Sequence, residues 1–231
     1  MKPLSGYARY QTALAKFASA YMDPASKAKM RGEQYLRPTD KAFASVFNGF
    51  TEIANTLEAL ELAEVLIGLP APKSRRIKKD EYLKFLIGAY LQEVYILEKR
   101  LSAYATKISR LYKSNGKIQS LANTIRVVFD GITRTRGSHV HSQRYSDQKL
   151  DMLSGFALIS ASKQEFGTAM HSQYKFVQRE WRKTVQGNNA ATRTFLDNYC
   201  DQLFPHISRD GDIFLPRTGR GGPAHATKRE A

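Results

Sequence analysis

Cysteine is the scarcest reactive residue in this sequence. Cys200 is the single cysteine among 231 residues, so no disulfide can form within the chain. It sits among apolar positions of an expected helix, which favours a buried thiol over a nucleophile. No apolar run is long enough to cross a bilayer, and the first residues, MKPLSGYARYQ, lack a signal-peptide core. These absences predict a cytoplasmic protein that does not contact membranes.

Several signatures of familiar chemistry are also missing. The sequence contains no glycine-rich strand–turn–helix signature for nucleotides, no Cys/His spacing for zinc and no serine-centred nucleophile elbow. We therefore expect neither a cofactor nor a metal ion. His171, His206 and His225 are scattered along the chain, which favours structural or surface roles for them.

Acidic residues are few, and the charge is unevenly distributed. The formal net charge is +15, from 36 basic and 21 acidic residues. Residues 42–72 hold no Lys or Arg but four glutamates, whereas residues 99–146 hold ten basic residues and one acid, Asp130. A further five cations lie in KSRRIKK, residues 73–79. Such asymmetry favours a polyanionic partner, and nucleic acid in particular.

Alternating strand patterns are absent, and helical periodicity dominates. Apolar residues recur at helical spacing in the ranges 7–21, 39–68 and 80–113. The third range carries a stripe about nine turns long, suited to packing against another long helix within the same chain. A shorter helix is expected over 118–132, and one helix or a pair from 147 to 185.

Residues that disfavour helix set the remaining expected boundaries. QGNN, residues 186–189, predicts a break, and one more helix should end before Pro205. We therefore expect an all-α fold, a helical bundle with long antiparallel helices. Its parts would be an N-terminal helical extension (1–38), the bundle (39–204) and a basic, disordered tail (205–231).

The octad RTRGSHVH, residues 134–141, concentrates the groups that chemistry would need. It contains two overlapping pairs, each with four residues between Arg and His: Arg134 with His139, and Arg136 with His141. Histidine can take a proton from a ribose 2′-hydroxyl or return one to a leaving 5′-oxygen. Arginine holds a phosphate whose charge grows in the transition state. These groups suffice for metal-independent cleavage of RNA.

Helix geometry limits how these pairs can work. Residues five apart on a regular helix are rotated by about 140°, so an Arg/His pair needs a break between its members. Gly137 permits that break. If the chain is extended beyond it, His139 and His141 point to opposite sides, and we favour His141 slightly as the reactive one. The alternative interpretation is a basic turn with structural histidines.

The segments around the octad resemble a known superfamily. YLQEVYILEKRL, IQSLANTIRVVFDGITRTRG and HVHSQRYSDQKLDML look like the core of the HEPN superfamily, whose hallmark is Arg followed after four to six residues by His. The resemblance covers roughly residues 40–180 and implies a helical bundle that dimerises, with two motifs forming one ribonuclease site. It also implies a role in toxin–antitoxin systems or antiviral defence, with an antitoxin as a further protein partner.

The resemblance assigns roles to the octad but leaves the register open. Arg134 or Arg136 would bind phosphate, and His141 or His139 would transfer protons; Arg134 with His141 also fits the hallmark. Sequence alone therefore predicts a homodimeric, metal-independent endoribonuclease acting on RNA. Two alternatives stay open: a noncatalytic RNA-binding or assembly module, and a structural protein whose long stripe serves oligomerisation.

Overall fold

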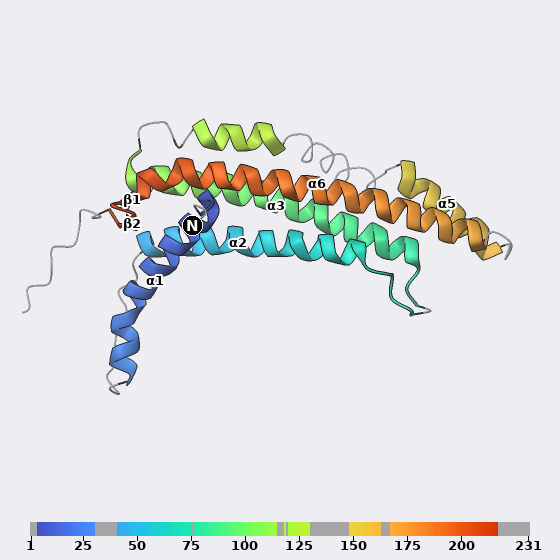
Figure 1. Cartoon of the computed structure of the whole chain (residues 1–231), viewed down its shortest axis with the longest axis horizontal. Coiled ribbons are helices and arrows are strands. Elements are labelled where there is room, and N and C mark those ends of the chain that lie inside the picture. Colours follow the sequence, from blue (N-terminus) through green and yellow to red (C-terminus); the bar gives the residue numbers. More distant parts are fainter. Residues whose placement is uncertain are drawn as a thin grey trace, which may run out of the picture.

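The structure is a computed structural model, and it describes residues 4–30, 41–74, 76–114, 118, 120–129, 148–162 and 167–216. The chain forms an elongated all-α bundle (Figure 1). Its labelled helices are α1 (Gly6–Met30), α2 (Lys41–Gly68), α3 (Lys79–Tyr112), α5 (Gln148–Ser162) and α6 (Gly167–Ile207). Residues 120–129 form a further helical segment between α3 and α5. The predicted all-α fold is confirmed.

Three long helices carry the architecture. α2 runs antiparallel to α3 and α6, and these three lie side by side along the length of the molecule (Figure 1). α1 packs across one end against α6, while α5 packs against the opposite end of α6. The helix pair expected between 147 and 185 is therefore α5 followed by the first half of α6.

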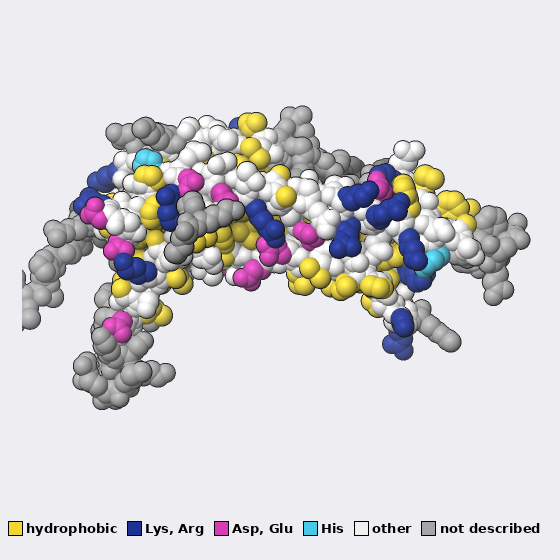
Figure 2. All heavy atoms as spheres, in the orientation of Figure 1, with side chains coloured by type: hydrophobic (Ala, Val, Ile, Leu, Met, Phe, Trp, Pro, Cys, Tyr) yellow, Lys and Arg dark blue, Asp and Glu magenta, His cyan; other side chains and the backbone are white. Residues whose placement is uncertain are grey.

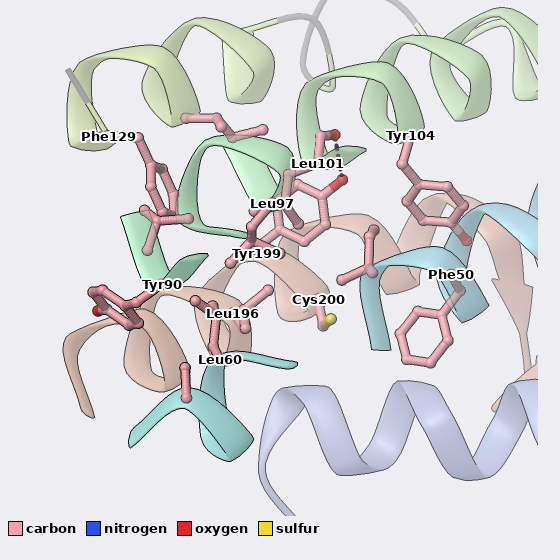
Figure 3. Packing of buried hydrophobic residues seen from close by; sticks show 14 of the residues in the cluster. Phe50, Leu60, Tyr90, Leu97, Leu101, Tyr104, Phe129, Leu196, Tyr199 and Cys200 are labelled. Carbon is pink, nitrogen blue, oxygen red and sulfur yellow. Dashed lines mark hydrogen bonds between the residues drawn. The ribbon is translucent and has the colours of Figure 1, made fainter. Parts of the chain in front are cut away.

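The long apolar stripe of α3 is the centre of the core. The stripe packs within this chain and is almost wholly buried: Leu83, Ile87, Tyr90, Val94, Leu97, Leu101, Tyr104 and Ile108 are each 2% exposed or less. Residues from α2, α6 and the segment 120–129 close around it (Figure 3). The prediction that this stripe forms intramolecular core is confirmed.

Buried tyrosine hydroxyls tie the helices together at specific points. The hydroxyl oxygens of Tyr10 and Tyr104 lie 2.5 Å apart, and Tyr104 also donates to the carbonyl of Val46 at 3.1 Å. Tyr199 donates to the carbonyl of Leu101 at 2.9 Å (Figure 3). Because a buried hydroxyl without a partner is costly, these bonds fix the relative positions of α1, α2, α3 and α6.

The start of α1 is fitted closely to α6. A Cβ atom on Gly6 would lie 2.2 Å from the backbone oxygen of Asp197, so only glycine allows this approach. The backbone N–H of Tyr7 donates to the Asp197 carboxylate at 2.9 Å, and Arg9 pairs with Asp201 at 2.7 Å. Carboxylates at a helix N-terminus also interact favourably with its dipole.

The expected break at residues 186–189 is wrong, because α6 is continuous over 41 residues. Asn189 is buried and its side-chain amide donates to Glu64 on α2 at 2.7 Å. A Cβ on Gly187 would meet nothing within 4 Å, so this glycine only weakens the helix locally. Tertiary packing on either side outweighs that loss of propensity.

The helix also continues past the expected stop at Pro205. It ends at Ile207, which is fully buried, and the burial of this last turn outweighs the missing proline N–H. A two-residue hairpin follows, in which β1 (Ser208–Arg209) pairs antiparallel with β2 (Asp212–Ile213). Its turn residues, Asp210 and Gly211, both have positive φ. Ordered structure thus extends beyond the boundary drawn at 205.

Candidate nucleic-acid interface

The predicted reacting groups lie outside the described residues. Arg134, Arg136, His139 and His141 all fall within residues 130–147, so their mutual arrangement is not among the described features. The described structure instead gives the two points at which this stretch leaves and rejoins the bundle. At both points the chain packs against α6.

The flanks of the octad segment are firmly packed. Phe129, the last described residue before it, is 3% exposed, and its ring meets that of Phe195 edge-on at 5.6 Å. After it, Leu150 of α5 is 1% exposed, and Lys149 pairs with Glu180 at 3.5 Å. Glu180 and Phe195 are fifteen positions apart on α6, or about 22 Å along its axis. The two flanks of the segment are thus held against one helix, α6.

Two of the four glutamates of α2 are ion-paired within the molecule, and a third accepts a hydrogen bond. Arg100 of α3 pairs with Glu52 at 2.5 Å, and Arg193 of α6 pairs with Glu61 at 2.8 Å. Glu64 accepts the bond from Asn189 already described. These glutamates are occupied by the chain's own donors, so they are poorly placed to compete for an external cationic partner.

Three of the four cations on the first half of α6 have no such compensation among the described residues. Residues 167–186 hold four basic side chains and one acid, Glu180. Among the described residues, no carboxylate lies within 4.0 Å of Lys175, Arg179 or Arg182. Figure 2 shows Lys and Arg side chains gathered over this part of α6. We call this surface the basic face; it comprises Lys149, Lys175, Phe176, Arg179, Arg182 and Lys183.

An exposed aromatic ring lies within the basic face. Phe176 is 41% exposed, and the Lys149 ammonium and the Arg179 guanidinium each lie 6.0 Å from its ring centroid. Lys149 and Lys183 both lie near Glu180, at 3.5 and 3.6 Å. A phenylalanine ring surrounded by cations offers a flat apolar surface next to positive charge.

The other side of the basic face holds the end of α2. The Gln178 side-chain amide donates to the carbonyls of Ile67 and Leu69 at 2.9 and 2.6 Å, which satisfies groups at the α2 C-terminus. The Arg182 guanidinium lies beside Gly68, within 3.4 Å of where a Cβ would be. A cation here complements the negative end of the α2 dipole. Exposed Lys73 and Arg76 follow directly in the loop.

The isolated reactive residues are not arranged for chemistry in the described structure. Cys200 is 2% exposed and burial raises the pKa of its thiol, so the expectation of a buried, inert cysteine is confirmed. His171 is exposed and His206 partly buried, while His225 lies outside the described residues. No group of three or more His, Cys, Asp or Glu side chains in the described ranges could hold a metal ion.

A cavity at the α1 end of the bundle is unsuited to a phosphate. It has a volume of about 310 Å³, lies between α1, α2 and α6, and is lined in part by Tyr7, Glu58, Glu61 and Asp197. Burial, followed by nearby negative charge, raises the pKa of Tyr7 to about 12. Three carboxylates and a single arginine make this cavity electronegative, so a polyanion would be repelled from it.

The basic face was not predicted from the sequence. Tyr174 and Trp181 of the same helix pack internally, with exposures of 4% and 7%. The available signal was the spacing of Lys175, Arg179 and Lys183 at intervals of four, which places them on one side of a helix.

Across the described ranges, no helix has an apolar stretch sufficient to cross a bilayer. Comparison of the chain with family models, with curated proteins and with solved structures gave no match.

Proposed function

We propose that the chain is an RNA-binding protein that cleaves RNA without a metal ion, using the octad of residues 134–141. The observation that carries this proposal is the overlap of two Arg/His pairs in the most basic stretch of the sequence. Arg134 or Arg136 would hold the scissile phosphate. His141 or His139 would remove the 2′-hydroxyl proton or protonate the leaving 5′-oxygen.

Two described features support this assignment. Both ends of the octad segment continue into helices that pack against α6 with their apolar sides buried, so a catalytic turn there would have a rigid support. The segment rejoins the bundle at Lys149, a member of the basic face. Lys149 lies eight positions after His141, a chain length of at most about 28 Å.

Cleavage in EDTA tests the catalytic proposal. We expect wild-type protein to cut RNA but not DNA of the same sequence, because DNA lacks the 2′-hydroxyl nucleophile. His141→Ala or His139→Ala should slow cleavage by about 10²- to 10⁴-fold, the usual contribution of a general acid or base. His171→Ala, which removes an exposed histidine of α6, is the matched control. Equal activity of both octad histidine variants would refute the assignment.

The composite site is a second part of the proposal. The HEPN resemblance implies that two copies of the chain contribute to one active site. If one copy supplies the arginine and the other the histidine, mixing the inactive Arg134→Ala and His141→Ala proteins should restore activity in mixed dimers. Sedimentation should show a dimer. A monomer that cleaves RNA would contradict the composite site but not the catalytic role of the octad.

The same resemblance places the activity in a toxin–antitoxin or antiviral system. We expect expression of the wild-type chain to slow cell growth and the His141→Ala chain to leave it unchanged. An antitoxin partner would relieve the effect of the wild-type chain. Equal toxicity of both chains would separate growth inhibition from catalysis.

A noncatalytic RNA-binding module is the alternative function. The observation that favours it is the basic face, where Lys175, Arg179 and Arg182 have no described carboxylate within ion-pair distance and do not depend on the octad. This alternative predicts RNA binding that weakens steeply with salt, survives both histidine substitutions and yields no cleavage products.

A further inference from the structure

We infer that the basic face is a docking site for single-stranded RNA, in which an unpaired base stacks on Phe176 while the surrounding cations hold phosphates. This inference rests on the proposed RNA function and adds the location and the strandedness of the bound RNA. It is independent of whether the octad cleaves.

The charge of the face selects a polyanion. Lys175, Arg179 and Arg182 are exposed and lie on about two turns of one helix. Their charges are not cancelled by any described carboxylate within ion-pair distance. From position 175 to position 183 the helix rises about 12 Å, which matches a short stretch of a few nucleotides.

The ring selects unpaired bases over a duplex. Stacking needs a base whose flat face is free, and in a duplex those faces are occupied by neighbouring base pairs. Phe176 presents an exposed ring, and the Lys149 and Arg179 cations lie over it at 6.0 Å from its centroid, close enough to contact the phosphates next to a stacked base. A purely electrostatic surface would not require this ring.

A second exposed phenylalanine shows why the surroundings matter. Phe85 on α3 is 71% exposed, more than Phe176. It lines a groove between α3 and α5 that also contains Asp80, Glu81 and Asp151, with Lys84 as the cation. Phosphates would be repelled there, so an exposed ring alone does not make a binding site. Phe85 is therefore the matched control.

Fluorescence anisotropy measures the effect directly. The probe is a labelled 12-nucleotide RNA, single-stranded or as a blunt duplex, added in EDTA to the His139→Ala/His141→Ala protein so that cleavage cannot interfere. Phe176→Ala should weaken binding of the single strand by about 5- to 100-fold, the usual effect of losing one stacked base. Duplex affinity should change less than about twofold, because the phosphate contacts remain.

Two further variants separate stacking from charge. Phe176→Trp should retain or improve single-strand binding, since tryptophan also stacks, and Phe85→Ala should leave it unchanged. Arg179→Glu should weaken binding of both probes and flatten the salt dependence by about one unit of slope. Unchanged thermal melting of each variant would show that the fold is intact.

Three outcomes would overturn the inference. The first is an equal loss of single-strand affinity in Phe176→Ala and Phe85→Ala. The second is an equal loss of affinity for single strand and duplex in Phe176→Ala. The third is binding to vesicles of anionic lipid in preference to RNA. A wild-type protein that does not cleave RNA but shows the Phe176 effect would refute the catalytic proposal and leave this docking site standing. Cleavage of RNA by a protein whose binding does not depend on Phe176 would support the catalytic proposal and refute this docking site.

Discussion

Replacing Tyr104 with phenylalanine tests the hydroxyl pair that joins α1 to α2 and α3. The ring stays, so packing volume is kept, but the bonds to the Tyr10 hydroxyl at 2.5 Å and the Val46 carbonyl at 3.1 Å are lost. Tyr10 is fully buried, and within the described structure its hydroxyl has no other hydrogen-bond partner. Leaving it unpaired should lower the free energy of unfolding by about 1–3 kcal/mol.

The loss of unfolding free energy should differ between the two single variants, Tyr10→Phe and Tyr104→Phe. In Tyr10→Phe, the Tyr104 hydroxyl keeps its acceptor on Val46, so this change should cost less than Tyr104→Phe. The double variant leaves neither hydroxyl unpaired, so its cost should fall clearly below the sum of the two. The shortfall, on the order of 1 kcal/mol, is the coupling between the pair.

Urea unfolding followed by circular dichroism at pH 7 provides the four free energies. For a chain of this length, each kcal/mol should also move the melting temperature by about 2–4 °C. Additive costs, or a larger loss for Tyr10→Phe than for Tyr104→Phe, would refute the reasoning.

Three other predictions follow from the same packing. Stability should fall as pH rises above about 10, because burial raises the pKa of Tyr10 and Tyr104 in the folded chain, so these hydroxyls ionise first in the unfolded chain. Urea midpoints from pH 8 to 11 measure this fall. The midpoint of the Tyr10→Phe/Tyr104→Phe variant should decline less. Gly6→Ala should lower the melting temperature, since its Cβ would lie 2.2 Å from a backbone oxygen of α6, whereas Gly88→Ala, with nothing within 4 Å, should raise it slightly. Cys200 should react with a thiol reagent only as the chain unfolds, so rapid labelling of the native protein would contradict its burial.

Helical periodicity predicted the long elements because their buried residues come from one stripe each. The expected range 80–113 became Lys79–Tyr112, and 39–68 became Lys41–Gly68. In both cases local spacing and long-range packing agree, so the sequence pattern contains the information that the fold uses. Their ends were also marked, by prolines or by a turn.

The continuity of α6 could not be predicted, because it depends on a partner distant in sequence. Asn189 favours a break on local propensity, yet it is held by Glu64, which lies 125 positions earlier. The hairpin after Ile207 was also missed, although its Asp210–Gly211 turn is a recognisable signal; two-residue strands are too short for alternation to show.

The candidate site, like the fold, could be predicted from the sequence only in part. The octad was found from residue types and spacing, and its register stays a prediction, because the four side chains lie outside the described residues. The exposure of Phe176 could not be read from the sequence, because it depends on which side of α6 the neighbouring helices cover. An aromatic residue between Tyr174 and Val177 looks like core until the buried side of the helix is known.

The uninterrupted length of α6 also limits how the chain can change over evolution. Inserting or deleting one residue near Asn189 would rotate one half of the helix by about 100° and shift it by about 1.5 Å relative to the other. The first half carries the basic face and the second half packs against α1, so either the cations or the core would lose their partners. Homologous chains should therefore vary freely in the exposed residues of this helix, while gaps in their alignment fall in the connections before and after it.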